Sequence, residues 1–153
     1  MCRVLRDENF FKRGMKTLVN NTEVKVRFSE VDSLGIVWHG HYVKFFEDGR
    51  EAFGSEHGLG YMDVYEKGFA TPIVKLNVDY KKTVSYGESI RIETTFKPTP
   101  AAKIVFDFKI FKVDTDEVVA TGSSTQVFMT KAGQLHITNP PFFEEWKTKH
   151  GLV

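Results

Sequence analysis

Alternating apolar and polar positions dominate the second half of the chain. In residues 89–97, Ile90, Ile92 and Phe96 fall on one face, and charged residues fall between them. A period of two is typical of a β-strand with one buried face. The same pattern predicts further strands over residues 23–29, 71–80, 103–113 and 118–130.

Three of these strands have a definite predicted apolar face. The face consists of Val24, Val26 and Phe28 in the first strand, and of Ile104, Phe106, Phe108 and Ile110 in residues 103–113. In residues 71–80 it consists of Val74, Leu76, Val78 and Tyr80.

Residues 41–57 have a different period. Their apolar and small residues recur at spacings of three and four, which predicts a helix with one apolar stripe. Gly58 follows and indicates the C-terminus, because glycine adopts the left-handed conformation easily. Gly49 and Gly54 inside the helix each cost about 1 kcal/mol relative to alanine. We therefore expect this helix to pack closely against a sheet.

The order of these elements predicts the fold class. One strand, one long helix and four long strands with short connections favour an antiparallel sheet. The long helix is the one long element available to cover the apolar face. We expect an α+β fold in which a curved antiparallel β-sheet wraps around one long central helix. The small residues 120–124 would let the helix approach the sheet, and residues 142–150 are predicted to form a short terminal helix.

Length, charge and cysteine content exclude several classes. The 153 residues fit one domain, predicted over residues 15–153, with residues 1–14 as a tag-like or disordered extension. The net charge of +1 gives no basic excess for nucleic acid. The longest charge-free run, residues 118–130, is too short for a membrane span. A single cysteine, Cys2, excludes an intramolecular disulfide framework and favours a cytoplasmic location.

The segment VRFSEVDSLGIVWHGHYVKFFEDGR, residues 26–50, carries the candidate chemistry. It contains Asp32, the run 35–38 (Gly-Ile-Val-Trp), His39, Tyr42 and the run 46–50 (Phe-Glu-Asp-Gly-Arg). This segment resembles the hot-dog-fold acyl-CoA thioesterases of the 4-hydroxybenzoyl-CoA thioesterase-like family. Residues 78–80 and 86–92 resemble a second stretch of that family, with Glu88 where an aspartate is usual. The resemblance covers roughly residues 23–130 and implies a single hot-dog domain.

The resemblance implies a role for each part of the first segment. Asp32 would attack the thioester carbon or activate a water, and the backbone N–H of His39 would donate to the oxyanion. Helix N-termini suit both tasks, because their first N–H groups lack partners and carry the positive end of the dipole. Gly35 belongs to the same catalytic segment. The structural alternative for Asp32 is an Asx-turn in its loop.

His39 has two open interpretations. Its ring could orient water or the acyl carbonyl, since histidine titrates near neutral pH. Alternatively, only its backbone matters, and the ring packs over Trp38 or a neighbouring subunit. At the helix start, His41 stands where related sequences often carry asparagine, a better cap. The pair of His39 and His41 has no third ligand at a suitable spacing, so we expect no metal.

Substrate contacts are predicted from two groups of residues. Trp38, Tyr42 and Glu47 belong to the motif. Glu47 could act as a second acid or base, but we favour an ion pair with Arg50 one turn later, which would fix the helix against another subunit. The phosphates of coenzyme A require cations, for which the candidates are Lys81, Lys82, Arg91, Lys97 and Lys103. Ordinary outward-facing strand charges are the alternative for these five.

We therefore predict hydrolysis of an acyl-CoA or acyl-carrier thioester without metal or redox cofactor. The family implied by the resemblance forms dimers and tetramers, and an open sheet favours edge-to-edge pairing, so we expect a homo-oligomer. Two alternatives remain open: a hot-dog hydratase or dehydratase, and a non-catalytic module that binds acyl groups or acyl carriers.

Overall fold

The structure is a computed structural model and describes residues 17–152. The predicted extension over residues 1–14 lies outside the described residues. The strands are β1 (Val19–Lys25), β2 (Phe69–Ala70), β3 (Ile73–Tyr80), β4 (Ser89–Lys97), β5 (Lys103–Lys112), β6 (Val118–Thr130) and β7 (Leu135–His136). The helices are α2 (Tyr42–His57), α3 (Tyr61–Glu66) and α4 (Pro141–Lys149), and two 3-10 turns are η1 (Phe28–Glu30) and η2 (His39–His41).

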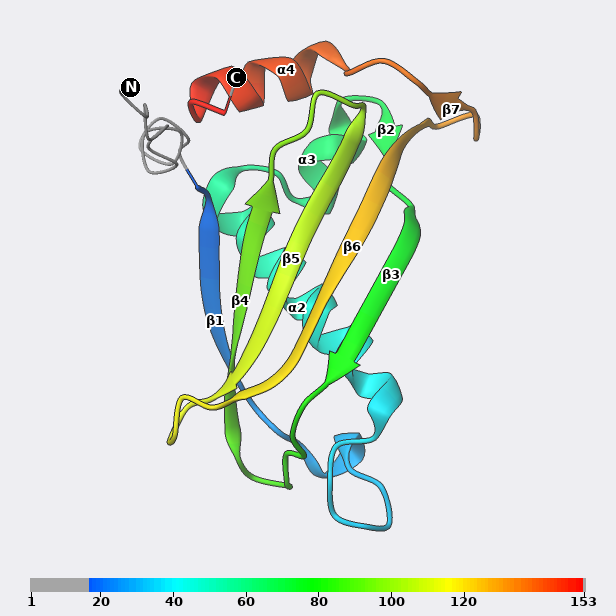
Figure 1. The fold of residues 1–153 in the computed structure, drawn as a ribbon. Coiled ribbons are helices and arrows are strands. Elements are labelled where there is room, and N and C mark those ends of the chain that lie inside the picture. The colour runs from blue at the N-terminus through cyan, green and yellow to red at the C-terminus, as the bar shows by residue number, and fades with distance from the viewer. Residues whose placement is uncertain (1–16, 153) are drawn as a thin grey trace, which may run out of the picture.

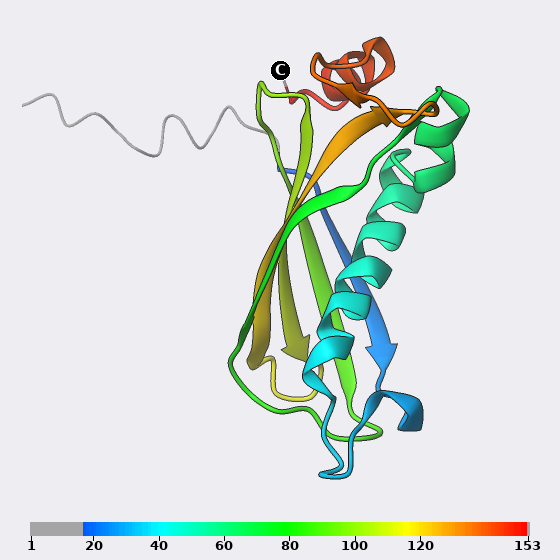
Figure 2. The same cartoon turned by 90° about the vertical axis from the view of Figure 1, so that its right-hand side faces the viewer.

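The strands form one antiparallel sheet that curves around α2 (Figures 1 and 2). The order is β1-β4-β5-β6-β2, and β3 and β7 also pair with β6. Strands β1 and β3 are therefore the long edges of the sheet. The predicted α+β hot-dog architecture is confirmed.

Glycines set the distance between α2 and the sheet. A Cβ added to Gly49 would lie 2.4 Å from Oγ1 of Thr94 on β4, and one added to Gly122 would lie 2.5 Å from the ring of Phe46. The Phe46 ring stacks on Phe108 of β5, with centroids 4.4 Å apart. The close approach predicted for Gly49 and for the small residues of β6 is thus confirmed. Gly54 differs, because its nearest neighbour is the backbone of Gly60 and not the sheet.

The end of the sheet near the C-terminus of α2 is closed by α4, which the pattern predicted, and by three short elements that it did not predict. The short helix α3 and the two-residue strands β2 and β7 lie there, and α4 lies at the same end of the molecule (Figures 1 and 2). Phe143 and Trp146 of α4 are buried. The predicted terminal helix at residues 142–150 is confirmed within one residue at each end.

Two predicted faces need correction. The first strand runs over Val19–Lys25 rather than residues 23–29, and Phe28 begins η1 with 77% of its surface exposed. The chain leaves the sheet there to form the loop that contains Asp32. In β3, Leu76 and Val78 are half-buried, whereas Val74 and Tyr80 are exposed, because β3 is an edge strand. The predicted buried faces of β4 and β5 are confirmed.

Candidate active site

The loop that contains Asp32 is held in shape by its own backbone. The Asp32 N–H donates to the Ile36 carbonyl, and the Gly35 N–H donates to the Asp32 carbonyl, each at 2.9 Å. Gly35 has φ +75°, a conformation that glycine adopts without the steric cost of a side chain. An isolated antiparallel β-bridge between Val31 and Val37 closes the base of this loop. Gly35 thus shapes the turn through its backbone.

The Asp32 carboxylate has one backbone partner. Its Oδ1 accepts the Leu34 N–H at 2.8 Å, which is the Asx-turn that the sequence left as an alternative. The carboxylate also lines an open cleft of about 420 Å³. One oxygen therefore orients the side chain in its loop, and the same side chain borders a space large enough for part of a substrate.

The N-terminal end of α2 faces the same cleft. The helix is preceded by η2, and neither element has a side-chain cap. His39 begins η2 and lines the cleft. The first N–H groups of a helix have no acceptor within it, and here the His41 N–H donates to the Trp38 carbonyl at 2.9 Å.

Trp38 packs on the polypeptide next to it rather than lining the cleft. Its ring centroid lies 4.8 Å from that of His39 and 5.4 Å from that of His41. A Cβ on Gly40 would overlap the Trp38 ring at 2.1 Å, so the glycine permits this packing. The alternative that the His39 ring packs beside Trp38 is therefore observed, together with its position at the cleft.

Tyr80 is a site residue that sequence reasoning did not select. Its hydroxyl donates to the His39 carbonyl at 2.8 Å, and its ring meets the buried ring of Tyr42 edge-on at 5.1 Å. Burial first, and then the neighbouring Tyr80, raise the pKa of Tyr42 above its ordinary value. Both tyrosines line the cleft. The sequence signals for Tyr80 were its place at the end of a predicted strand and the resemblance of residues 78–80 to the second stretch of the family, and neither assigned it a role.

Glu30 is a second residue that the sequence analysis missed. It is 1% exposed, and its carboxylate accepts the Arg27 N–H at 2.7 Å and pairs with Lys44 of α2 at 3.2 Å. Its carbonyl accepts the Trp38 N–H. Glu30 therefore ties the start of the Asp32 loop to both the helix and the segment before it. Nothing in the local pattern distinguishes it from a solvated glutamate.

The structure brings together five of the predicted site residues. Asp32, His39, Tyr42, Lys81 and Lys82 all line the cleft. Lys82 pairs with Glu117, and this ammonium lowers the pKa of the Glu117 carboxyl below its ordinary value.

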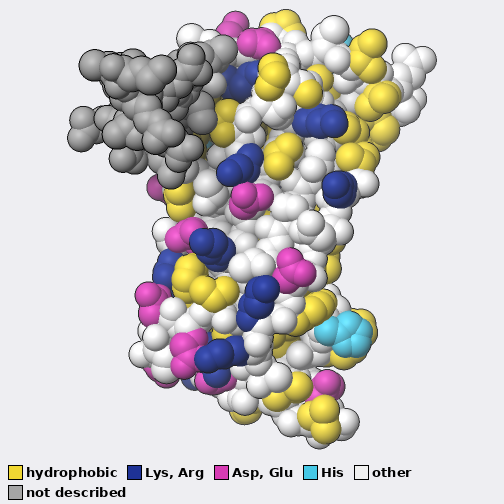
Figure 3. Space-filling view, viewed as in Figure 1, with side chains coloured by type: hydrophobic (Ala, Val, Ile, Leu, Met, Phe, Trp, Pro, Cys, Tyr) yellow, Lys and Arg dark blue, Asp and Glu magenta, His cyan; other side chains and the backbone are white. Residues whose placement is uncertain are grey.

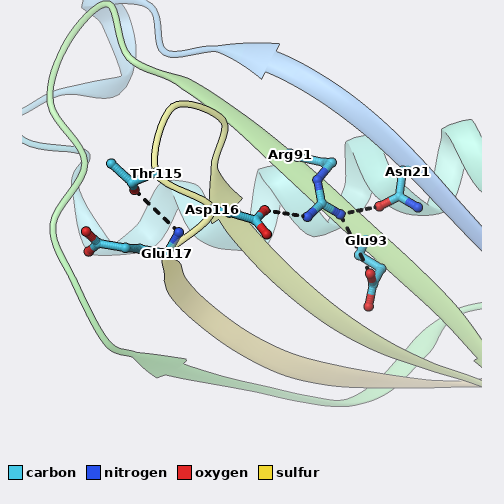
Figure 4. Close-up of polar contacts among 6 residues, drawn as sticks. All are labelled: Asn21, Arg91, Glu93, Thr115, Asp116 and Glu117. Carbon is cyan, nitrogen blue, oxygen red and sulfur yellow. Dashed lines mark hydrogen bonds and ion pairs between the residues drawn. The ribbon is translucent and has the colours of Figure 1, made fainter.

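Arg91 and Lys97 lie elsewhere. Figure 4 shows Arg91 of β4 among other partners: Nη2 contacts Asp116 at 2.9 Å and Nη1 contacts Asn21 at 2.6 Å. Lys97 pairs with Asp107 across the strands at 3.5 Å. Figure 3 shows cationic and acidic side chains intermixed on this face of the sheet. The structure therefore agrees with the alternative of ordinary strand charges for Arg91 and Lys97, and it does not place either at the cleft.

Glu47 also lies away from the cleft. Its carboxylate is exposed and accepts from Arg50 Nη2 at 2.9 Å, as the spacing predicted. Burial lowers the pKa of Arg50, and Glu47 acts in the opposite direction. The pair lines a second pocket further along α2.

Within residues 17–152, no cluster of three or more His, Cys, Asp or Glu side chains has the arrangement of a metal site. The same part of the chain contains no helix with the length and apolar character that crossing a bilayer requires.

Comparison with known proteins defines the class. A profile described as the thioesterase-like superfamily matches residues 26–147. The chain is 30% identical over 132 residues to the putative acyl-CoA thioesterase YneP of Bacillus subtilis, covering 86% of this chain and 95% of the relative. The chain therefore belongs to the thioesterase-like superfamily, and the predicted enzyme class, a thioester hydrolase, is confirmed.

Solved structures support the same fold. The DHNA-CoA thioesterase of Staphylococcus aureus superposes with a TM-score of 0.77 at 28% identity, covering 86% of this chain and 89% of the other. A mutant 4-hydroxybenzoyl CoA thioesterase complexed with 4-hydroxybenzoyl CoA gives a TM-score of 0.73 at 23% identity, with coverage of 84% and 98%. The second likeness shows the fold alone.

Proposed function

We propose that the protein hydrolyses an acyl-CoA thioester to the free acid and CoA in the cleft beside Asp32. One observation carries the proposal: the Asp32 carboxylate and the uncapped start of α2 border the same cleft. Acyl transfer needs a nucleophile or base beside donors for the developing oxyanion, and these two features are candidates for those parts.

Two routes are consistent with this arrangement. In the first, Asp32 attacks the thioester carbon, the C–S bond breaks, and water then hydrolyses the resulting anhydride. In the second, Asp32 takes a proton from the water that attacks the carbon. In both, the sulfur leaves as thiolate and acquires a proton to become the CoA thiol. The N–H of His39 would donate to the carbonyl oxygen, and Tyr80 would hold that peptide through the His39 carbonyl.

Asp32→Asn tests the proposal directly. Asparagine retains an oxygen that can accept the Leu34 N–H, so the loop should keep its shape, but it cannot act as a carboxylate. We expect turnover to fall by at least about 10²-fold, measured as thiol release from acyl-CoA, with the melting temperature unchanged. Asp114→Asn, in an exposed turn, is the matched control and should retain activity. Near-normal hydrolysis by Asp32→Asn would remove Asp32 from the mechanism.

Water carrying heavy oxygen can identify the first route. If Asp32 attacks and water then opens the anhydride at the aspartyl carbonyl, repeated turnovers leave heavy oxygen in the Asp32 peptide, as measured by mass spectrometry. A general base transfers only a proton and leaves that peptide unlabelled, and so does an anhydride opened at its acyl carbonyl, so only a labelled peptide distinguishes the routes.

Other outcomes would favour the two alternative functions. Binding of acyl-CoA without turnover, unchanged in Asp32→Asn, would favour a module that binds acyl groups or acyl carriers. A change in enoyl absorbance without thiol release would favour a hydratase or dehydratase. The thiol assay and the absorbance assay therefore need to be run on the same preparation.

The charge of the cleft suits the phosphates of CoA. Lys81 and Lys82 line the cleft beside Asp32, and Lys82 also forms an ion pair with Glu117. We infer that these lysines contact the nucleotide end of the substrate.

The free edge of β3 supports assembly into a homo-oligomer. Strand β3 pairs with β6 on one side, and Ile73 and Val74 on it are exposed. Exposed strand edges tend to pair with another chain. We infer that two copies associate along β3. Light scattering should report at least a dimer, and Val74→Lys should shift it towards monomer; a monomeric wild-type protein would overturn this inference.

Hydrolysis changes no oxidation state, so the proposed reaction needs no redox cofactor. The absence of a metal requirement and the cytoplasmic location remain predictions from the sequence. The first of these is tested by assaying hydrolysis in the presence of a chelator.

A further inference from the structure

Glu30 is a buried carboxylate to which the proposed hydrolysis gives no task. Its side chain is 1% exposed, and it stands two residues before Asp32. An ionised group loses its hydration on burial, and the cost is large unless hydrogen bonds and an opposite charge replace the water. A charge at such a position therefore needs a physical reason.

The short turn η1 does not supply that reason. One carboxylate oxygen of Glu30 accepts the Arg27 N–H at 2.7 Å, just before η1 begins. An uncharged oxygen can accept the same bond, as glutamine does in the capping box of a helix. The negative charge is not needed for this contact, so its reason lies with the other oxygen.

The other oxygen contacts the first turn of α2. It lies 3.2 Å from Nζ of Lys44, the third residue of the helix. The Lys44 side chain is 46% exposed, so the carboxylate of this pair is buried while the ammonium keeps part of its hydration. Hydrogen bonds between charged groups are roughly twice as strong as those between neutral groups. The pair therefore fastens residue 30 to the N-terminal end of α2.

The backbone extends this attachment to Asp32. The Glu30 carbonyl accepts the Trp38 N–H at 3.0 Å, and the Asp32 N–H donates to the Ile36 carbonyl at 2.9 Å. These bonds join the two arms of the Asp32 loop as a narrow hairpin, whereas His39 begins the turn that leads into α2. The attachment of the hairpin to the helix therefore sets where Asp32 lies relative to the start of α2.

We propose that Glu30 and Lys44 form a positioning pair, in which the charge of Glu30 holds the Asp32 loop against the N-terminal end of α2. The effect of the pair on turnover rests on the proposed hydrolysis. Neither side chain lines the cleft, so the pair acts through Asp32 and not on the substrate.

Glu30→Gln removes the charge and keeps an oxygen for the Arg27 N–H. A displaced catalytic group can cost about 10²-fold in rate, so we expect kcat for thiol release from acyl-CoA to fall by at least about tenfold. KM should change by less than about twofold. Lys44→Met removes the other charge at a half-exposed position and should also lower kcat by at least about tenfold. The double variant should be no slower than the slower single variant, because both changes break one contact.

Amide hydrogen exchange gives a second readout that needs no catalysis. In Glu30→Gln and in Lys44→Met, the N–H groups of Asp32 and Trp38 should exchange about fivefold faster than in wild type, which corresponds to the loss of one hydrogen bond. The N–H groups of β4 should exchange as before. Glu144→Gln is the matched control, because it breaks a contact of the same kind, to Lys147 at 3.7 Å on α4. It should change neither kcat nor the exchange of the loop.

A merely structural role would lower the melting temperature and leave kcat of the folded variants at the wild-type value, and that result would overturn the proposal. Losses that multiply in the double variant would do the same. If Glu30→Gln does not fold, Lys44→Met decides alone, and wild-type kcat or unchanged exchange in it would count against the pair. If the wild-type protein releases no thiol, the proposed hydrolysis fails. The exchange rates then decide: faster exchange in the variants supports the pair, and unchanged exchange overturns it.

Discussion

The two tryptophans of the chain lie at opposite ends of α2 and have opposite surroundings. Trp146 is 7% exposed, packs on Phe96 and Phe143, and donates its indole N–H to the His57 carbonyl at 2.7 Å. Trp38 is 46% exposed and lies just before the helix start.

The two ends of the same helix therefore differ in how their backbone groups are paired. At the C-terminal end, carbonyl groups have partners, including the Gly58 N–H bond to Gly54 and the Trp146 bond to His57. At the N-terminal end, no side chain caps α2, and the His41 N–H just before the helix donates to the Trp38 carbonyl at 2.9 Å.

Replacing each tryptophan by alanine should give the largest contrast. Trp146→Ala removes a buried ring and a hydrogen bond, and we expect it to lower the free energy of unfolding by about 3–5 kcal/mol. Trp38→Ala removes a half-exposed ring and should change it by less than about 1 kcal/mol. Thermal or denaturant unfolding measures both. Similar losses in the two variants would contradict the comparison.

The glycines at the two ends predict a second contrast. Alanine at Gly54 would place its Cβ 2.7 Å from the Gly60 backbone, which cannot move alone. We expect Gly54→Ala to destabilise the protein by about 1–3 kcal/mol despite the better helix propensity of alanine. At Gly40, the three atoms nearest an added Cβ all belong to the ring of Trp38, a side chain that is 46% exposed, so we expect the stability of Gly40→Ala to stay close to wild type. Thermal or denaturant unfolding measures the stability of both variants. A Gly54→Ala protein as stable as wild type would refute the packing argument.

Tyr80→Phe tests the N-terminal end of α2, where Tyr80 is proposed to position the His39 peptide. It removes the hydroxyl bond to the His39 carbonyl, whose net value is about 1 kcal/mol. If that bond orients the oxyanion donor, kcat should fall by about fivefold with little change in KM. A purely structural role would lower the melting temperature without this effect on kcat. Tyr86→Phe, an exposed tyrosine outside the cleft, is the control.

Asp48→Asn should give the smallest effect, on the pH dependence of stability. Burial raises the pKa of Asp48; Lys44 opposes this shift, and Glu30 adds to it. A carboxyl with a raised folded-state pKa favours folding when protonated, and this contribution is lost as the pH rises through that pKa. Asparagine mimics the protonated form, so the variant should melt slightly higher than wild type at pH 7. The gain should shrink as the pH falls towards about 4. A lower melting temperature at pH 7 would reverse the sign and contradict this.

Much of the fold was predictable because its signals are local. The alternation of Ile90, Ile92 and Phe96 identified β4, and the spacing of aromatic residues before Gly58 identified α2. The loop residues of the cleft were found through a family motif rather than through periodicity. Phe28 shows where alternation fails: it continues the pattern of β1, but the chain has already left the sheet.

Other features depend on contacts between distant parts of the chain. Tyr80 reaches His39 across 41 positions, and Arg91 meets Asn21 across 70, because strand register and helix placement bring them together. The second pocket likewise combines residues of α2, β5 and β6.

The sequence alone was sufficient for the long helix, for most of the long strands, for the close approach at Gly49 and for the motif, since these depend on side-chain period and turn chemistry within a few residues. Only the folded chain decided which cations reach the cleft, which tryptophan is buried and which lysine pairs with Glu30. The physical reason is that burial and pairing depend on the packing of α2 against the sheet, and no local stretch of sequence contains that geometry.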